Sequence, residues 1–289
     1  MHPMSGSDQY FLGLPAWAFP GWKDRYFTDA PTRLASYASV FDTVEGNTTF
    51  YRTPDSNTVS RWRDAVAGCD FRFSFKLPRN VTHEHNPDME ELHKFLQALA
   101  PLEAHLAPML VQFPATVAPG DLRRFEPVFA ALADRHRFVV EVRHLAFFDE
   151  PERLEPVLER FRAGRVVLDS RPLYQGDRNH PEVLDALHAK PDVPVLTEVY
   201  NSVALLRLIL HPDIVSNRPY IDEWATHVAG FLNEGVETYV MIHCPNNLHC
   251  PPLARDFHDT LKARADSPDL QPLAPWPLPA EQQSLFPAS

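Results

Sequence analysis

Two strand-like segments of the sequence carry paired charges where a buried strand would normally be apolar. In "FVVEVRH", residues 138–144, Glu141 and Arg143 interrupt a run of β-branched residues, and Asp169 and Arg171 stand two residues apart in the same way. Residues two apart in a strand share a face, so each segment has one charged face and one apolar face. Isolated charges in a core cost several kcal/mol each, so we expect these groups to meet other polar groups.

The same alternation gives further strand-like segments a polar face near their C-terminal ends. The side chains on the polar faces of all these segments are Glu45, Asn47, Lys76, Gln112, Glu141, Arg143, Asp169, Arg171 and His243. Carboxylates and a histidine at one level predict acid/base catalysis by Glu45, Glu141, Asp169 and His243. Lysine and arginine bind phosphate or carboxylate, which predicts an anion site formed by Lys76, Arg143 and Arg171, with Asn47 and Gln112 orienting the ligand.

Two other interpretations of these residues remain open. Glu45, Glu141, Asp169 and His243 include ligand types that bind Mg²⁺, Mn²⁺ or Zn²⁺, although Arg143 and Arg171 would compete for two of the carboxylates. A divalent metal cofactor is therefore a candidate. Alternatively, the Glu–Arg and Asp–Arg pairs are structural ion pairs that close the top of the fold.

Aromatic residues and a histidine near the first strands add weaker candidates. Trp17, at the end of the first strand-like run, is a candidate for stacking on a sugar or base, whereas Trp62 fits core packing. His83 is a candidate acid, with a surface-loop position as the alternative. In "IHCPNNLHC", residues 242–250, the spacing matches no common zinc pattern, so we assign His243 to the site and leave Cys244 out.

Eight strand-like runs separated by amphipathic stretches must position these side chains. The runs are 10–17, 41–51, 71–78, 109–114, 138–144, 165–172, 205–210 and 238–245, and the helical stretches are 31–39, 56–67, 87–100, 121–135, 151–162, 181–189, 222–233 and 253–265. Alternating strands and helices imply parallel pairing by right-handed crossovers. Eight repeats predict a single (β/α)8 TIM-type barrel over residues 1–265, with the polar groups at its C-terminal mouth.

Two points of this assignment have rivals. A doubly wound open sheet is disfavoured because "PAWAFPGW", after the first strand, is not a glycine-rich phosphate turn. The seventh strand is ambiguous, since residues 205–210 also fit a helix and residues 193–200 compete for the strand position.

Composition limits the class of protein. The formal net charge of −11 excludes broad non-specific binding to nucleic acid but is compatible with a local basic pocket. Three cysteines do not suggest a disulfide framework, and the sequence has neither a long apolar run nor a signal peptide. We therefore expect a cytoplasmic protein without a membrane segment.

Five motifs occur in an order that resembles the YecE-like family, also called the domain of unknown function 72. They are "VEGNTTFY", "FKLPRNVTH", "LVQFP", "VEVRH" and "DSRP". The resemblance implies a (β/α)8 fold, loosely compared with sugar isomerases and endonuclease IV-type barrels, but no established activity. Late in the chain this sequence departs from the pattern of many members and has "LLRLILHPD" and "MIHCPNN", as in the YecE-type branch. The resemblance therefore does not fix roles for Arg207, His211 and His243.

We therefore predict an enzyme that acts on a phosphorylated sugar or a nucleic-acid sugar-phosphate. A metal-dependent sugar isomerase is one alternative. The other is a non-catalytic module, because the proline-rich tail, residues 266–289, ends in "EQQSLF". Gln282, Leu285 and Phe286 resemble the peptide that docks on the bacterial DNA sliding clamp, with two apolar anchors for a pocket and an amide for its rim.

Deletion of residues 281–289 tests the clamp prediction. The intact chain should bind purified sliding clamp in a titration, and the truncated chain should not, because the deletion removes both apolar anchors. A variant with Leu285→Ala and Phe286→Ala serves as a matched control of full length. Failure of the intact protein to bind the clamp would remove this alternative.

Overall fold

The chain forms a barrel of eight parallel strands in the computed structural model, which describes residues 9–278. The strands are β1 (Tyr10–Leu14), β2 (Thr43–Gly46), β3 (Arg72–Phe75), β4 (Met109–Gln112), β5 (Phe138–Glu141), β6 (Gly164–Asp169), β7 (Val203–Ile209) and β8 (Glu237–His243). Their order around the sheet is β3-β2-β1-β8-β7-β6-β5-β4. All seven registered neighbour pairs are parallel.

Short contacts between β3 and β4 bring the two ends of the sheet together. Phe73 pairs with Leu106 and Lys76 with Leu110, both in parallel bridges. The Leu77 N–H donates to the Leu110 carbonyl over 3.0 Å. The sheet is therefore a nearly closed cylinder, and the predicted (β/α)8 fold is confirmed.

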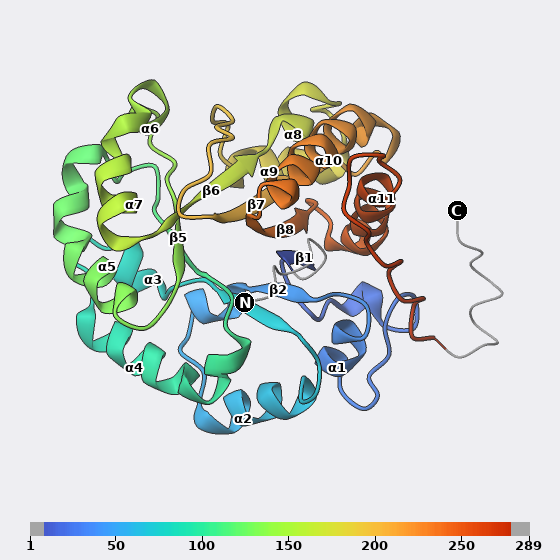
Figure 1. Ribbon diagram of the computed structural model, residues 1–289, viewed down its shortest axis with the longest axis horizontal. Coiled ribbons are helices and arrows are strands. Elements are labelled where there is room, and N and C mark those ends of the chain that lie inside the picture. Colours follow the sequence, from blue (N-terminus) through green and yellow to red (C-terminus); the bar gives the residue numbers. More distant parts are fainter. Residues whose placement is uncertain (1–8, 279–289) are drawn as a thin grey trace.

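Helices surround the strands on the outside (Figure 1). They are α1 (Arg33–Ala38), α2 (Ser56–Ala65), α3 (Arg79–Thr82), α4 (Met89–Leu99), α5 (Glu126–Ala133), α6 (Ala146–Asp149), α7 (Glu155–Phe161), α8 (Arg171–Gln175), α9 (Pro181–Ala189), α10 (Arg218–Asn233) and α11 (Cys250–Lys262). Side chains that accept hydrogen bonds start several of them: Thr32, Asp55 and Asp88 cap α1, α2 and α4.

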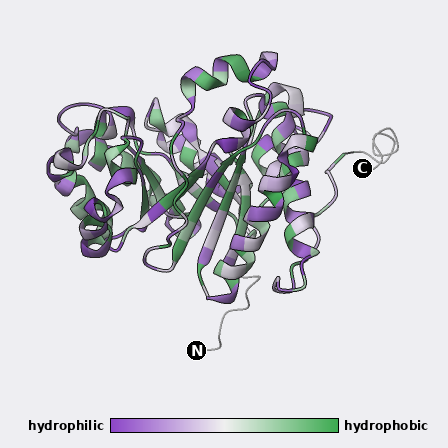
Figure 2. Ribbon diagram, turned by 90° about the horizontal axis from the view of Figure 1, so that it is seen from above, coloured by the Kyte–Doolittle hydropathy of each residue, from purple (hydrophilic) through white to green (hydrophobic). Residues whose placement is uncertain are grey.

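The strands divide their side chains between two packed regions. Outward residues such as Val140 and Val240 pack under the helices in the main core. Inward residues, among them Phe11, Leu110 and Tyr239, fill the lower part of the barrel. Figure 2 shows the strands as hydrophobic ribbons inside more polar helices. The interior is thus solid apolar packing up to the level where the polar side chains begin.

The structure resolves the ambiguity over the seventh strand. Residues 203–209 form β7, whereas residues 193–199 are neither strand nor helix. Several strands also end earlier than the apolar runs suggested. The run at 41–51, for example, leaves the sheet at Gly46 and continues as a short 3-10 helix, Asn47–Phe50.

The described end of the chain lies against the barrel. Residues 268–278 contain neither helix nor strand, yet Leu270 is buried. The Trp276 ring packs edge-on against Phe27 at 5.8 Å between centroids, and the Arg255 guanidinium lies over it at 4.2 Å. The boundary placed at residues 265 and 266 remains a prediction.

All three cysteines are free thiols. A search of residues 9–278 for a helix both long and apolar enough to cross a bilayer finds none.

Gly13 occupies a position in β1 where the barrel leaves no room for a side chain. A Cβ at this residue would stand 2.2 Å from the Thr43 carbonyl oxygen, which is fixed in the neighbouring strand. Gly13→Ala should therefore lower the free energy of unfolding by more than about 2 kcal/mol in urea titrations. Gly230→Ala in α10 is the matched control. A Cβ there meets nothing within 4 Å, and the change should stabilise the protein by about 0.5–1 kcal/mol. Equal stability of both variants would contradict this account.

Candidate active site at the mouth of the barrel

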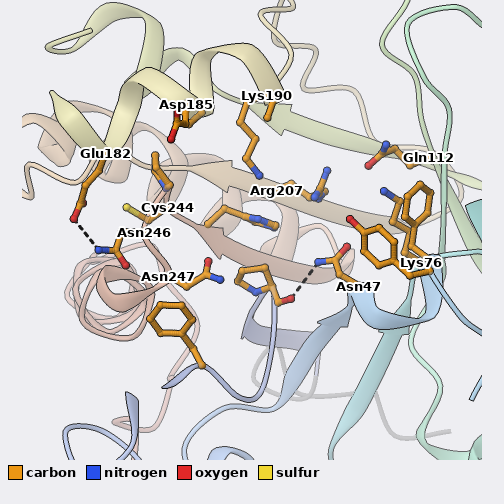
Figure 3. A pocket seen from close by; sticks show the side chains of 18 of the residues that line it. Asn47, Lys76, Gln112, Glu182, Asp185, Lys190, Arg207, Cys244, Asn246 and Asn247 are labelled. Atoms are coloured by element: carbon orange, nitrogen blue, oxygen red, sulfur yellow. Dashed lines mark hydrogen bonds between the residues drawn. The ribbon is translucent and has the colours of Figure 1, made fainter. Parts of the chain in front are cut away.

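A cavity of about 790 Å³ opens at the C-terminal ends of the strands. Its lining residues are Pro15, Phe19, Asn47, Phe50, Tyr51, Lys76, Gln112, Arg143, Glu182, Asp185, Ala186, Ala189, Lys190, Arg207, His243, Cys244, Pro245, Asn246 and Asn247. Figure 3 shows the labelled side chains around this space. The strand ends supply its floor, and α9 with the loops after β2 and β8 supplies its walls.

A buried ion triad forms the floor of the cavity. Arg207 of β7 donates from Nε and Nη2 to the two carboxylate oxygens of Glu45, over 2.7 and 2.9 Å. Its Nη1 donates to Oε2 of Glu141 on the other side. All three side chains are at most 5% exposed. One guanidinium therefore joins β2, β5 and β7 across the barrel.

Amides and further ions complete the hydrogen bonding of the triad. Asn47 Nδ2 donates to Glu45 Oε1 over 2.8 Å, and His243 Nε2 lies 3.2 Å from Glu45 Oε2. Arg143 donates from Nε to Glu141 Oε1 over 2.7 Å and from Nη2 to Gln112 Oε1 over 3.0 Å. Each oxygen of the two carboxylates thus has at least one donor, which is what buried ions require.

These contacts keep both glutamates ionised. Burial by itself would raise the pKa of each carboxyl. The charge of Arg207 and the hydrogen bonds and charges of the other neighbours together outweigh burial, so the pKa of Glu45 lies well below its usual value and the pKa of Glu141 falls to about 2. Neither carboxylate is available to take up a proton near neutral pH.

His243 is neutral at physiological pH. Burial lowers its pKa to about 4, against the opposing attraction of the Glu45 carboxylate. A neutral ring that places Nε2 beside a carboxylate carries its proton there, so Nδ1 is left as an acceptor.

Lys76 stands at the end of β3 with its amine beside an aromatic ring. Its Nζ lies 3.7 Å from the centroid of Phe50, and the side chain is about nine-tenths buried. Burial, assisted by the charges of Arg207 and Arg143 and opposed by those of Glu141 and Glu45, lowers the pKa of this amine to about 8. Within residues 9–278, no carboxylate lies within ion-pair distance of Nζ.

The opposite wall holds a second lysine and the acids of the rim. Lys190, just beyond α9, extends toward the centre of the cavity (Figure 3), and burial lowers the pKa of its amine. Glu182 of α9 accepts from Asn246 Nδ2 over 2.7 Å and contacts His249 at 3.1 Å. Lys190 has no ion-pair partner among the described residues, whereas Glu182 is already engaged.

The predicted position of Asp169 in the mouth is wrong. Leu168 pairs with the inward-facing Arg207, so the next residue, Asp169, points outward to the helices. There its Oδ2 accepts from Trp224 Nε1 of α10 over 2.7 Å, and the carboxylate is fully buried. Asp169 therefore anchors α10 and does not reach the cavity.

Arg171 likewise lies outside the mouth of the barrel, beside Asp169. Its Nη2 donates to Asp169 over 2.7 Å and to Glu223 of α10 over 3.0 Å. The predicted anion site thus loses Arg171. Lys190, which the sequence analysis did not single out, supplies a cation in its place.

Trp17 also lies outside the cavity lining. Its ring packs edge-on against Trp62 at 5.2 Å and against Phe73, which faces the helices, at 6.2 Å. The aromatic residues that line the cavity are Phe19, Phe50 and Tyr51, and Tyr51 is 82% exposed. Phe50 and Tyr51 belong to the "NTTFY" end of a motif quoted above, three and four residues after Asn47.

The remaining sequence candidates divide between the mouth and the surrounding loops. His83 packs edge-on against Phe50 at 4.8 Å, and burial lowers its pKa to about 4. Cys244 lines the cavity, contrary to its exclusion above, and burial raises the pKa of its thiol to about 12. His211 is buried and bonded to Asp177 and Asn217, away from the cavity lining. Gln282, Leu285 and Phe286 lie outside the described residues.

The candidate metal ligands do not form a ligand set. Asp169 faces α10, and Arg207 lies between Glu45 and Glu141 and uses their oxygens. Over residues 9–278, no group of three or more histidine, cysteine and acidic side chains is arranged to hold a metal ion. A cation would have to displace the guanidinium, so this donor set does not fit a divalent metal.

The fold and the site define a (β/α)8 barrel with a charged, polar cavity at its C-terminal mouth. The family model described as "Protein of unknown function DUF72" matches residues 11–279, and the chain belongs to this family. The UPF0759 protein YecE of Escherichia coli strain K12 is 31% identical over 283 residues, which cover 96% of this chain and 99% of YecE.

Two solved structures of DUF72 family proteins share the fold. The protein from Enterococcus faecalis V583 has a TM-score of 0.67 at 18% identity and covers 92% of this chain and 100% of its own. The protein from Thermotoga maritima MSB8 has a TM-score of 0.67 at 20% identity and covers 88% and 99%.

Removal of Arg207 tests the triad. Arg207→Met should lower the free energy of unfolding in urea by about 3–5 kcal/mol, because buried Glu45 would lose its arginine and buried Glu141 one of its two. The triple variant Glu45→Gln, Glu141→Gln, Arg207→Met removes all three charges and should recover most of this loss. If Arg207→Met alone matches the parent protein, the triad does not hold the barrel together.

Proposed function

We propose that this chain is an enzyme that binds a small phosphorylated sugar, or the sugar-phosphate unit of a nucleic acid, in the cavity at the barrel mouth. The observation that carries the proposal is a pair of lysines on the wall of the cavity without carboxylate partners in the described part of the chain. Lys76, Arg143 and Lys190 line it, and the two lysines have no carboxylate partner among residues 9–278. A phosphate would satisfy these donors.

The dimensions and aromatic residues of the cavity suit a ligand of this kind. A volume of about 790 Å³ lies within the range of small-molecule sites, which is about 300–1,000 Å³. Phe50 and the exposed Tyr51 stand at one side, where a sugar ring or a base can stack. Asn47 and Gln112 offer amide groups at the floor.

The triad changes the roles that we assign to the polar residues. Glu45 and Glu141 stay ionised and bonded to Arg207, so we assign them to positioning and to the local field. Neutral His243, through Nδ1, is the better candidate for accepting a proton from a bound hydroxyl. Arg143 and Lys190 would hold the phosphate.

The alternatives derive less support from the site. Residues 9–278 contain no set of ligands for the metal that a metal-dependent sugar isomerase needs. Docking on the sliding clamp rests on the tail sequence alone, and it is compatible with an active mouth.

Binding of ribose 5-phosphate tests the proposal, because this compound represents both substrate classes. Calorimetry should detect binding of ribose 5-phosphate but not of ribose. Arg143→Gln should weaken the affinity about tenfold or more, because it removes a charged donor worth about 1.5–3 kcal/mol. Lys94→Gln, which changes an exposed lysine paired with Glu90 on α4, is the control and should leave the affinity unchanged.

Two results would contradict the proposal. One is equal binding of ribose and ribose 5-phosphate by the intact protein. The other is an affinity for ribose 5-phosphate that Arg143→Gln and Lys94→Gln lower to the same extent.

A further inference from the structure

Lys76 combines features that a phosphate-binding lysine does not need. It is about nine-tenths buried, although a lysine that serves only as a point charge keeps its amine in water. Its Nζ lies against the Phe50 ring at 3.7 Å, and the residue lines the cavity. Among the described residues, Lys76 forms no ion pair that would hold the amine in its charged state.

Two exposed lysines of the chain provide a contrast with this environment. Lys23 and Lys94 pair with Asp29 and Glu90 at 2.7 and 2.6 Å, and these contacts raise the pKa of both amines. Burial is the main influence on the Lys76 amine and lowers its pKa. The charges of Arg207 and Arg143 act in the same direction, and those of Glu141 and Glu45 oppose it. Desolvation and neighbouring cations are the two means by which proteins turn a lysine into a nucleophile.

We propose that Lys76 is a nucleophile that forms a Schiff base with the carbonyl group of a phosphorylated aldose or ketose. This inference rests on the proposed function and narrows its substrate to the open-chain carbonyl form of a sugar phosphate. Arg143 and Lys190 hold the phosphate, and Lys76 contacts the carbonyl carbon.

The step balances without a further reactant. The lone pair of the neutral Lys76 amine attacks the carbonyl carbon, and the electron pair of the C=O bond moves to oxygen, which takes the proton that the attacking nitrogen releases. The carbinolamine then loses its hydroxyl group and one proton as water while the C=N bond forms. The product is an imine whose protonated form withdraws electrons from the adjacent carbon.

A neutral amine is accessible at ordinary pH. With a pKa of about 8, about a tenth of Lys76 is unprotonated at pH 7. The reactive fraction rises with pH and reaches one half near pH 8, whereas an ordinary lysine reaches this point above pH 10.

Pyridoxal 5-phosphate is a suitable probe, because it carries an aldehyde and a phosphate in one small molecule. The intact protein is treated with a low ratio of the probe at pH 7, reduced with borohydride, digested and analysed by mass spectrometry. Lys76 should be labelled at least about tenfold faster than Lys94, in line with its larger neutral fraction. Labelling should increase with pH, with a midpoint near 8.

Lys76→Arg separates a nucleophile from a binding charge. Arginine keeps the positive charge but does not form an imine, so this variant should lose the adduct at position 76 and still bind ribose 5-phosphate. Lys76→Met checks the fold and should unfold at the same temperature as the parent protein, because the amine has no ion-pair partner among residues 9–278 to be left behind.

The outcomes distinguish this inference from the proposed function. Labelling of Lys76 no faster than that of Lys94, or preferential labelling of Lys190, overturns the nucleophile assignment even if ribose 5-phosphate binds. Rapid labelling of Lys76 that excess inorganic phosphate does not slow supports the nucleophile and counts against the phosphate site. Rapid labelling that inorganic phosphate slows supports both.

Discussion

The rest of the site depends on the ion triad of Glu45, Arg207 and Glu141. Three ions removed from water at the centre of a barrel are costly unless every lone pair and proton is bonded, and the neighbouring residues supply those bonds. Asn47 and His243 complete the hydrogen bonding of the Glu45 carboxylate, and Arg143 completes that of the Glu141 carboxylate. The position of each polar group at the floor therefore follows from the need to satisfy the triad, whatever ligand the cavity receives.

The triad also decides which groups remain for chemistry. Arg207 lowers the proton affinity of both glutamates, so the acids that looked catalytic in the sequence serve as counter-ions. Their charge is balanced within the floor, and the cations above it are not balanced in the same way. Lys76 and Lys190 have no carboxylate partners within ion-pair distance among the described residues, and burial lowers the pKa of both amines.

Alternation along strands predicted much of this arrangement. Glu45, Lys76, Gln112, Glu141 and His243 each lie at the end of a strand whose opposite face is clearly apolar, and the structure brings their side chains to one level. The prediction for Asp169 failed because both faces of β6 carry apolar side chains before it, Val166 and Leu168 on one face and Val167 on the other. The face of Asp169 is set by the pairing of Leu168 with Arg207, a contact between distant segments that a single strand does not encode.

Other parts of the site left weaker signals in the sequence. Arg207 lies in a run that fits a helix as well as a strand, so its direction depended on an assignment that only the register of β7 against β8 settles. Lys190 follows α9 in a segment without periodicity, and its approach to the cavity depends on how that helix packs. Phe50 and Tyr51 lie beyond Gly46, where the chain leaves the strand and forms a short 3-10 helix.

The packed lower half of the barrel has a consequence for traffic through the molecule. Phe11, Leu110, Tyr239 and Met241 fill the interior beneath the polar floor, so the chamber is closed at one end. A ligand must therefore enter and leave through the opening at the C-terminal mouth. Water that reaches the polar floor must pass the bound ligand. A ligand bound at the mouth therefore limits the access of water to the polar side chains beneath it.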